Sequence, residues 1–291
     1  MIFQCMSQCK GKVLAIEAHP DDLVFFYGGT IAKLVDDGYR VKVITLTTGD
    51  QSTVNPRFTR REIEAIMHRE HATAMEIMGI TDQEYLEGFT NHFIFDGAQE
   101  MKVREILIRK IREFKPDTVI TFDIADSHEE NPDHRLLARV GLQAASFAAY
   151  PLVHPEQLEE GLEPHFVARV LLTPTREPNL FVDISGSPLE KKIKAGAAYS
   201  SQLELMVTEM EKRLETIGLN PDLDDISYEE LWETVCESMA GDTAKEARAF
   251  HEIHQDIAPR IKPEHAEAFR MQYLGAVEKI RDFLPKRCLV L

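Results

Sequence analysis

The chain is poor in the features that mark secreted and membrane-spanning proteins. Among its 291 residues are only four cysteines, and none of them forms a CxxC pair, so we expect reduced thiols in a cytoplasmic protein. The first twelve residues lack the apolar core of a signal peptide. No apolar run reaches the ~18–20 residues of a membrane span. The sequence therefore predicts a soluble, cytoplasmic protein without a membrane partner.

Positive charge is also scarce. The 33 basic residues are outnumbered by 49 acidic ones, which gives a net charge of −16. Nucleic acids and anionic membrane surfaces bind clustered positive charge, so this balance argues against both. Two common catalytic signatures are missing as well. There is no GxSxG of a serine hydrolase, and the pair Gly28-Gly29 lacks the spacing of a GxGxxG dinucleotide loop. With nucleic acids and membrane surfaces disfavoured, we expect the partner to be a small molecule.

What the chain does contain is a regular alternation of apolar patterns. Short β-branched runs predict strands at residues 12–18, 41–47, 84–89 and 118–122, and helical spacing predicts helices at 23–37, 57–79, 101–114 and 134–149. Strands that alternate with helices of this length indicate βαβ units and a mostly parallel sheet. The fold class we expect is therefore α/β, a Rossmann-like sheet flanked by helices.

The second half has a different pattern. Residues 151–164 are rich in Pro and Glu and predict a surface excursion, and residues 166–172 and 180–184 predict two more strands. From Pro188 onward the pattern is almost entirely helical, with a break at residues 220–225. No internal repeat or clean linker divides the chain. We expect a single domain over residues 1–291, with a sheet core at about 1–185 and a mainly helical C-terminal extension at about 186–291.

The first candidate for chemistry is the segment HPDD at residues 19–22, directly after the first predicted strand. Ligands of open α/β sheets bind at the carboxyl ends of the strands, which is where this turn lies. His19 and Asp22 are three residues apart, so one helical turn can direct both at one metal ion. Asp21 then projects differently and is available for acid–base work. The alternative is that Asp21 or Asp22 only caps the following helix.

The second candidate is the segment NPDHR at residues 131–135, after the strand predicted at 118–122. The alternative here is a helix cap at Asp133 with His134 exposed. Taken together, the two loops supply His19, Asp22 and His134, a three-ligand set with an open fourth position, as in catalytic Zn²⁺ sites. Zinc in such a site lowers the pKa of a bound water towards ~7 and polarises a carbonyl. Asp21 beside it can take the proton.

These motifs resemble the LmbE/PIG-L family, zinc-dependent N-deacetylases that act mainly on N-acetylglucosamine-type sugars. The resemblance is carried by AHPDD at 18–22, GGT at 28–30 and PDHR at 132–135. Further similar segments are TGD at 48–50, MGI at 78–80, PD at 116–117, FVDI at 181–184, SQ at 201–202 and EAFR at 267–270. The resemblance implies a metal-dependent hydrolase that removes an N-acetyl group from a sugar, a sugar conjugate or another small N-acetylated metabolite.

The resemblance also implies residue roles. It makes His19, Asp22 and His134 the ligands of Zn²⁺ or another divalent metal, and Asp21 the general base. It makes Asp133 a residue that supports the catalytic centre, as metal-site groups need orienting partners. Asp50, in the segment similar to the family's loop after its second strand, is expected to bind substrate. Because members of the family often assemble so that neighbouring chains wall the active site, a homo-oligomer is also expected.

The chain departs from the family at three positions. Asn131 stands where the family has a histidine that stabilises the transition state or serves as an acid. An amide can donate a hydrogen bond but cannot shuttle a proton, so either Asp21 acts alone or His128, in the same loop, substitutes as a catalytic residue.

The other two departures face the substrate. The family's Arg-x-x-Glu, whose arginine contacts the sugar, has Met67 in the arginine position here. The nearby Arg69 is two positions off, and we take it as the substrate-binding candidate. Tyr199 replaces a histidine that often precedes the SQ segment. These changes affect the expected sugar specificity more than the metal chemistry.

Three functional readings compete. The leading one is a zinc-dependent N-deacetylase. A second is another zinc-dependent amide or ester hydrolase, for instance a deacylase for longer chains. A third is a small-molecule-binding member of the family that has lost turnover, motivated by Asn131 and Met67.

Overall fold

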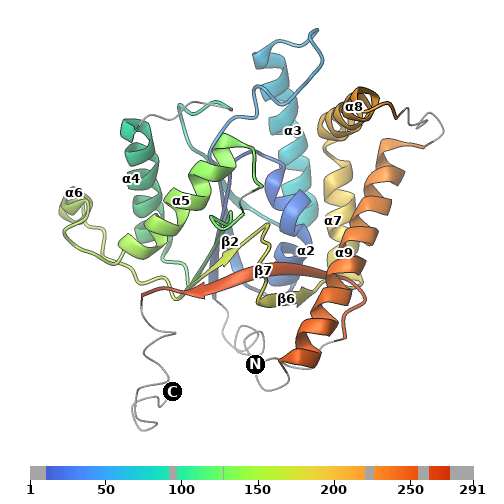
Figure 1. Ribbon diagram of the computed structural model, residues 1–291. Helices are drawn as coiled ribbons and strands as arrows, with labels where there is room; N and C mark the ends of the chain where they lie inside the picture. Colours follow the sequence, from blue (N-terminus) through green and yellow to red (C-terminus); the bar gives the residue numbers. More distant parts are fainter. Residues whose placement is uncertain (1–10, 92–96, 127, 220–225, 255–261, 276–291) are drawn as a thin grey trace.

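The computed structural model describes residues 11–91, 97–126, 128–219, 226–254 and 262–275. Within these ranges, seven strands form one mixed sheet with helices on both faces (Figure 1). The break predicted at residues 220–225 lies outside the described residues, as do Cys5, Cys9 and Cys288. The remaining cysteine, Cys236, is a buried free thiol. None of the described helices combines the length and the apolar character needed to cross a bilayer.

Five parallel strands form the main part of the sheet, in the order β3-β2-β1-β4-β5. They are β1 (Lys12–Glu17), β2 (Arg40–Thr45), β3 (Asp82–Tyr85), β4 (Thr118–Thr121) and β5 (Arg169–Leu172). The strand predicted at residues 84–89 begins two residues earlier, as β3. The strand order reverses between β1 and β4, and open α/β sheets bind ligands at such a reversal, beyond the carboxyl ends of the strands.

Helices cover both faces because β1 buries alternate side chains in two separate cores. Val13 and Ala15 pack into one core, and Leu14 and Ile16 pack into the other. The first core is covered by α2 (Asp22–Asp36), α3 (Arg60–Met78), α7 (Ser187–Ala197), α8 (Ser200–Thr216) and α9 (Tyr228–Ile253), and the second by α4 (Gly97–Phe114) and α5 (Pro132–Phe147). The short α6 (Pro155–Glu159) lies in the predicted excursion. A strand buried on both faces reads as a continuous apolar run, as residues 12–18 do.

The far edge of the sheet differs from the prediction. After β6 (Leu180–Asp183), the late segment Ala266–Tyr273 forms β7, which pairs antiparallel with both β5 and β6. We expected the chain after Pro188 to be almost entirely helical, and for this segment that expectation is wrong. Its Ala, Glu, Met and Arg residues favour helix intrinsically. Pairing on both sides and alternate burial of Glu267, Phe269 and Met271 override that preference.

Strand β7 also stabilises the irregular middle part of helix α2. Within α2 the backbone leaves helical geometry at Tyr27, so that a second helical segment starts there. The amides of Gly29 and Thr30 donate to the Glu267 carboxylate at 3.0 and 2.7 Å, which satisfies the free N–H groups of that new helix start. A Cβ on Gly29 would come within 2.7 Å of the Ile184 side chain. Close packing therefore explains this glycine.

Candidate active site

Two loops at the point of strand reversal bring the predicted metal ligands together. Residues 18–21 link β1 to α2, and residues 122–131 link β4 to α5. His19 and Asp22 come from the first connection and His134 from the first turn of α5, and all three side chains are buried. One ligand atom from each lies within 4.8 Å of the others, so this group can hold a metal ion.

The three side chains form a triangle of contacts in which each histidine approaches a different oxygen of Asp22. His19 Nδ1 lies 3.1 Å from His134 Nε2 and 3.4 Å from Asp22 Oδ2, and His134 Nε2 lies 3.1 Å from Asp22 Oδ1. Ligand atoms placed about 2.05 Å from a tetrahedral ion are about 3.3 Å apart. Each of the three contact distances is therefore close to the ligand spacing around a small tetrahedral cation.

The other ring nitrogen of each histidine contacts a carboxylate. His19 Nε2 lies 3.0 Å from Asp133 Oδ2, and His134 Nδ1 lies 2.9 Å from Glu129 Oε2. When these outer nitrogens carry the protons, the inner nitrogens have free lone pairs directed at the centre of the triangle. Carboxylate–histidine pairs of this kind orient metal-binding histidines. The sequence reading included Asp133 but missed Glu129, because Glu130 beside it offers the same chemistry and nothing in the sequence separates the two.

The electrostatics of the cluster favour positive charge at its centre. Burial opposes charge on His19, but the neighbouring Asp22 and the hydrogen bond with Asp133 outweigh it and raise the pKa of His19 to about 10. The same balance, with Asp22 as the main partner, raises the pKa of His134 to about 9. Burial likewise opposes charge on Asp22, yet the two histidines hold its pKa well below the ordinary value. A buried pocket that stabilises cations on its own side chains suits a metal cation.

Asp21 stands beside this triangle without capping its helix. It occupies the N-cap position of α2, but its side chain accepts no capping hydrogen bond. Asp22 is turned inward, since its Oδ2 accepts from the amides of Ala18 and His19 at 3.0 and 2.7 Å. Burial, and then the negative charge of Asp22, raise the pKa of the Asp21 carboxyl above its ordinary value. The structure thus does not support the capping alternative for Asp21.

The capping alternative also fails in the second loop. Asn131 is the N-cap of α5, and its side-chain oxygen accepts from the amide of Asp133 at 2.9 Å. Asp133 itself is fully buried against His19 instead of capping. His134 is buried as well, with the Phe122 ring stacked on it at a centroid distance of 4.2 Å.

A buried platform, not seen in the sequence, holds the backbone just before Asp21. The carbonyl oxygen of Pro20 accepts hydrogen bonds from the Tyr199 hydroxyl, at 2.6 Å, and from His71 Nδ1. Burial lowers the pKa of His71 to about 4, so this ring is neutral at pH 7. The only sequence signal for this platform is the departure at Tyr199, because the sequence does not show which backbone atom the hydroxyl reaches.

The remaining predicted residues lie outside the triangle. His128 is exposed, and its amide donates to Asp126. Arg69 is exposed on α3, and in the described part of the chain no hydrogen bond or ion pair joins it to the cluster. Asp50 is buried and accepts from the amide of Asn91 at 2.9 Å, so it fixes a loop. Substrate contact by Arg69 or Asp50 and catalysis by His128 stay predictions.

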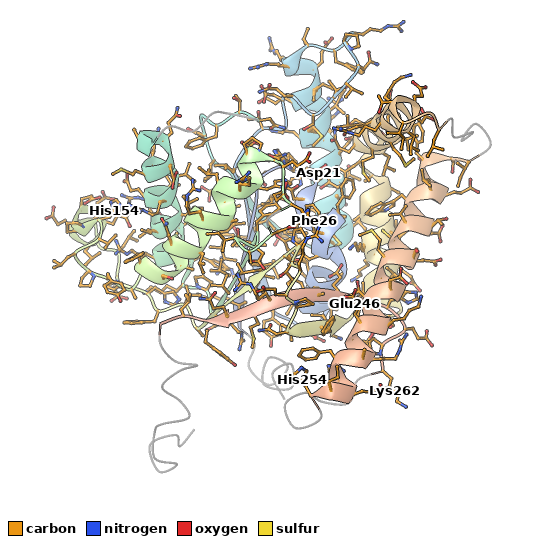
Figure 2. The ribbon with its side chains drawn as sticks, viewed as in Figure 1. Asp21, Phe26, His154, Glu246, His254 and Lys262 are labelled. Carbon is orange, nitrogen blue, oxygen red and sulfur yellow. The ribbon has the colours of Figure 1, made fainter. Side chains whose placement is uncertain are left out.

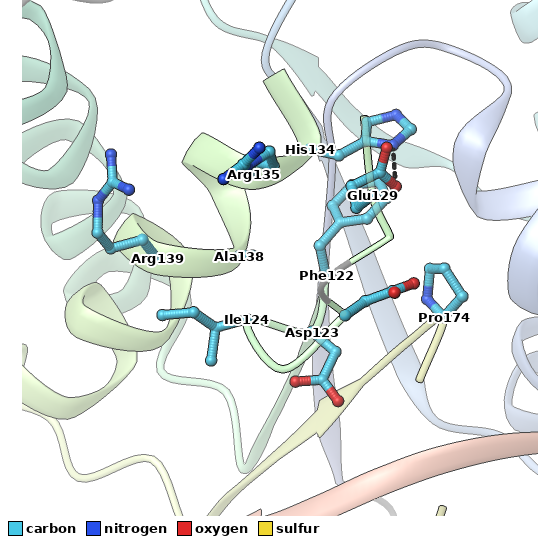
Figure 3. Close-up of a pocket in the computed structure, with 10 residues that line it drawn as sticks. Phe122, Asp123, Ile124, Glu129, His134, Arg135, Ala138, Arg139 and Pro174 are labelled. Carbon is cyan, nitrogen blue, oxygen red and sulfur yellow. Dashed lines mark hydrogen bonds and ion pairs between the residues drawn. The ribbon is translucent and has the colours of Figure 1, made fainter. Parts of the chain in front are cut away.

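A cavity of about 160 Å³ opens beside His134 (Figure 3). The carboxyl end of β4, the loop after it, the first turns of α5 and Pro174 line this cavity. Asp123 lines this cavity, accepts from Thr175 at 2.6 Å and pairs with Arg270. The triangle therefore borders a space large enough for a small polar group.

Comparisons with known proteins agree with this geometry. The family model described as PIG-L, GlcNAc-PI de-N-acetylase, matches residues 14–145, the range that contains all three triangle residues. A diacetylchitobiose deacetylase of Thermococcus kodakarensis is 34% identical over 209 residues, which are 72% of this chain and 76% of that protein. The chain belongs to the PIG-L family of de-N-acetylases, as the sequence motifs predicted.

Solved structures confirm the fold. The N,N'-diacetylchitobiose deacetylase of Pyrococcus horikoshii superposes with a TM-score of 0.72 at 24% identity, covering 99% of this chain and 91% of that one. A 4-carboxy-2-hydroxymuconate hydratase of Pseudomonas putida superposes with a TM-score of 0.65 at 20% identity, covering 90% and 95%. Because a hydratase shares this architecture, the reaction must be argued from the site and not from the fold.

Proposed function

We propose that this protein hydrolyses the acetamide of an N-acetylated amino sugar or sugar conjugate, with a zinc ion held by His19, Asp22 and His134. The observation that carries the proposal is the triangle, whose sides match the ligand spacing of a tetrahedral ion. A site of two imidazoles and one carboxylate leaves a fourth position for water or substrate, as catalytic zinc sites do. The relative that deacetylates diacetylchitobiose supports a sugar acetamide as substrate.

The bound metal and the side chains around it have different roles in this proposal. When bound, zinc lowers the pKa of water and polarises the acetamide carbonyl. Asp133 and Glu129 hold the two histidine rings in orientation by their outer nitrogens. The inner nitrogens are thereby kept available as ligands.

Asp21 moves the proton. Its carboxylate accepts a proton from the attacking water as the new C–O bond forms, and returns that proton to the nitrogen as the C–N bond breaks, giving acetate and a free amine. The raised pKa of Asp21 suits both steps, because the group then gains and loses a proton near neutral pH. Asn131 cannot carry a proton. Its oxygen is engaged in capping α5, so it can act on the substrate only as a hydrogen-bond donor through its amide nitrogen.

Acetate release is the direct test. The purified protein is assayed with N-acetylglucosamine, N,N'-diacetylchitobiose and an N-acetyl amino acid, with and without a chelator, and after zinc is restored. We expect release from the sugars, loss with the chelator and recovery with zinc. If the protein binds stoichiometric zinc but releases acetate from none of these substrates, the alternative of a small-molecule-binding protein without turnover is favoured. A preference for longer acyl chains or esters would favour the alternative hydrolase.

A further inference from the structure

A second and larger cavity lies at the same edge of the sheet. Its volume is about 250 Å³, and α9, the first turns of α2, the loop after β5 and the start of β7 enclose it. The residue pairing between β5 and β7 shows where this cavity lies. Leu172, the last residue of β5, pairs with Arg270, so residues 266–268 of β7 extend past the carboxyl end of β5. The first cavity lies at the carboxyl end of β4, the next strand in the sheet.

The two cavities share walls. Pro174 lines both. Phe26 lines the second cavity, and its ring lies 6.0 Å from the His134 ring and 5.9 Å from Phe122, edge-on to both. Figure 2 labels Asp21, at the N-cap of α2, near Phe26 of the same helix, and Glu246 on α9, which also lines the second cavity. One aromatic side chain therefore separates the second cavity from a metal-ligand candidate.

The lining of this second cavity is mixed, with an apolar part somewhat larger than the polar part; the polar lining residues are Thr173, Thr175, Lys192, Thr243, Glu246 and Glu267. The ion pair at its base is internally satisfied, because Glu267 accepts from Lys192 at 2.8 Å and from two amides of α2. Trp232 donates its N–H to the carbonyl of Ile193, which leaves the indole ring as the lining surface. Helices α2 and α9 contribute an apolar side to this cavity, which includes Phe25, Phe26, Trp232, Val235, Met239 and Ala240. This apolar side can bind hydrocarbon, because burying apolar surface against it is favourable.

We propose that this cavity binds an apolar group of the N-acylated substrate, an alkyl or aryl substituent of about six to eight carbons. Its volume is just below the roughly 300–1,000 Å³ of pockets that hold whole ligands, so it suits one part of a molecule whose amide lies at the metal triangle. The substituent can be attached on the acyl side or on the sugar side of the amide. The inference rests on the proposed function for its substrate, but the binding step can be tested without turnover.

Binding can be followed with the protein's own fluorescence, because Trp232 is the only tryptophan in the chain and lines the cavity. The probe is octyl β-D-glucoside below its critical micelle concentration. We expect a saturable change in Trp232 emission, lost in Thr243→Phe, which fills the cavity, and in Met239→Glu, which places a charge in it. Ser238→Phe is the matched control, since Ser238 is exposed on the same helix and does not line the cavity.

Trp232 also lines a separate apolar groove between α8 and α9. An emission change that survives Thr243→Phe and Met239→Glu would therefore place the alkyl chain in that groove and overturn the proposal. No saturable change in the wild type would overturn it too. Each of these outcomes is independent of catalysis.

Turnover measurements then show whether the apolar substituent is attached on the acyl side or on the sugar side of the amide. We compare kcat/KM for N-acetylglucosamine, N-octanoylglucosamine and the octyl glycoside of N-acetylglucosamine. Each buried methylene is worth about fourfold, so one of the two extended substrates should exceed the parent by at least about tenfold. Thr243→Phe should abolish that gain and leave the parent within twofold. If no compound is hydrolysed but the fluorescence result holds, the proposed function fails and the apolar site stands. A tenfold gain that Thr243→Phe does not change would refute the site.

Discussion

The two loops that build the candidate metal site are stabilised in different ways. Residues 18–21 are held through the backbone, because Asp22 accepts from two amides of its own turn and the Pro20 carbonyl accepts from Tyr199 and His71. Residues 122–131 are longer and are held through side chains. Glu129 contacts His134, and Asn131 caps α5. A short turn fixes its own ligands, whereas a long loop needs partners that orient its ligand.

This difference predicts different consequences of mutation. Changes around the short turn should disturb proton transfer by Asp21, because the platform below Pro20 sets the position of that carboxylate. Changes in the long loop should weaken metal binding, because Glu129 contacts the ligand His134 and also accepts from the amide of Asn131 at 2.7 Å. The following variants test this separation, from the largest expected effect to the smallest.

The largest effect should come from His134→Ala. It removes one of three ligands and should eliminate most bound zinc and all acetate release, while the fold persists. Metal content is measured after dialysis, and the fold is checked by thermal unfolding. The matched control is His128→Ala, an exposed histidine of the same loop. It should keep the metal, and a protein with His134→Ala that still holds stoichiometric zinc would refute the ligand assignment.

Asp21→Asn should keep zinc but lower kcat by at least about two orders of magnitude, because it removes only the proton acceptor. The pH dependence has a definite sign. A base works only when deprotonated, so activity falls as the pH drops through its pKa. Burial and Asp22 raise that pKa, so the acid limb of kcat/KM should lie above the ordinary range of an aspartate. Rates within a few-fold of wild type would show that another group takes the proton.

The contrast between the loops also explains what the sequence could predict. The parallel strands and the triangle were predictable because each rests on a local pattern, an apolar run followed by HPDD or PDHR, and because parallel strands place their carboxyl ends together. Strand β7 was not predictable, since its residues favour helix and only its pairing partners impose extension.

The supporting residues were predictable only in part. Asp133 lies next to a ligand and was anticipated. Glu129 and the platform of His71 and Tyr199 depend on contacts that the folded chain alone creates, and Tyr199 lies 179 residues from the Pro20 carbonyl that it holds. For Asp50 the folded chain adds a structural contact that the sequence did not show, because its carboxylate accepts from the amide of Asn91, while its contact with substrate stays a prediction.

Glu129→Ala should weaken zinc binding about 10- to 100-fold, the usual cost of losing a partner that orients a metal-binding histidine. At saturating zinc, kcat should recover most of its wild-type value, because Asp21 is untouched. Competition with a fluorescent chelator measures the affinity. Glu130→Ala is the neighbouring control and should bind zinc as the wild type does. Equal affinities for the two variants would remove Glu129 from the site.

Tyr199→Phe should have the smallest effect, a loss of kcat of about tenfold or less with zinc content and KM unchanged. The variant deletes one of two hydrogen bonds to the Pro20 carbonyl, and a neutral hydrogen bond contributes about 0.5–1.5 kcal/mol. Tyr150→Phe, at an exposed tyrosine, is the control. The deciding measurement is a double-mutant cycle with Asp21→Asn. If Tyr199 acts by positioning Asp21, its removal should change nothing once that carboxylate is gone. An undiminished loss in the Asp21→Asn background would mean that the hydroxyl acts by another route, and the separation between the two loops would then fail.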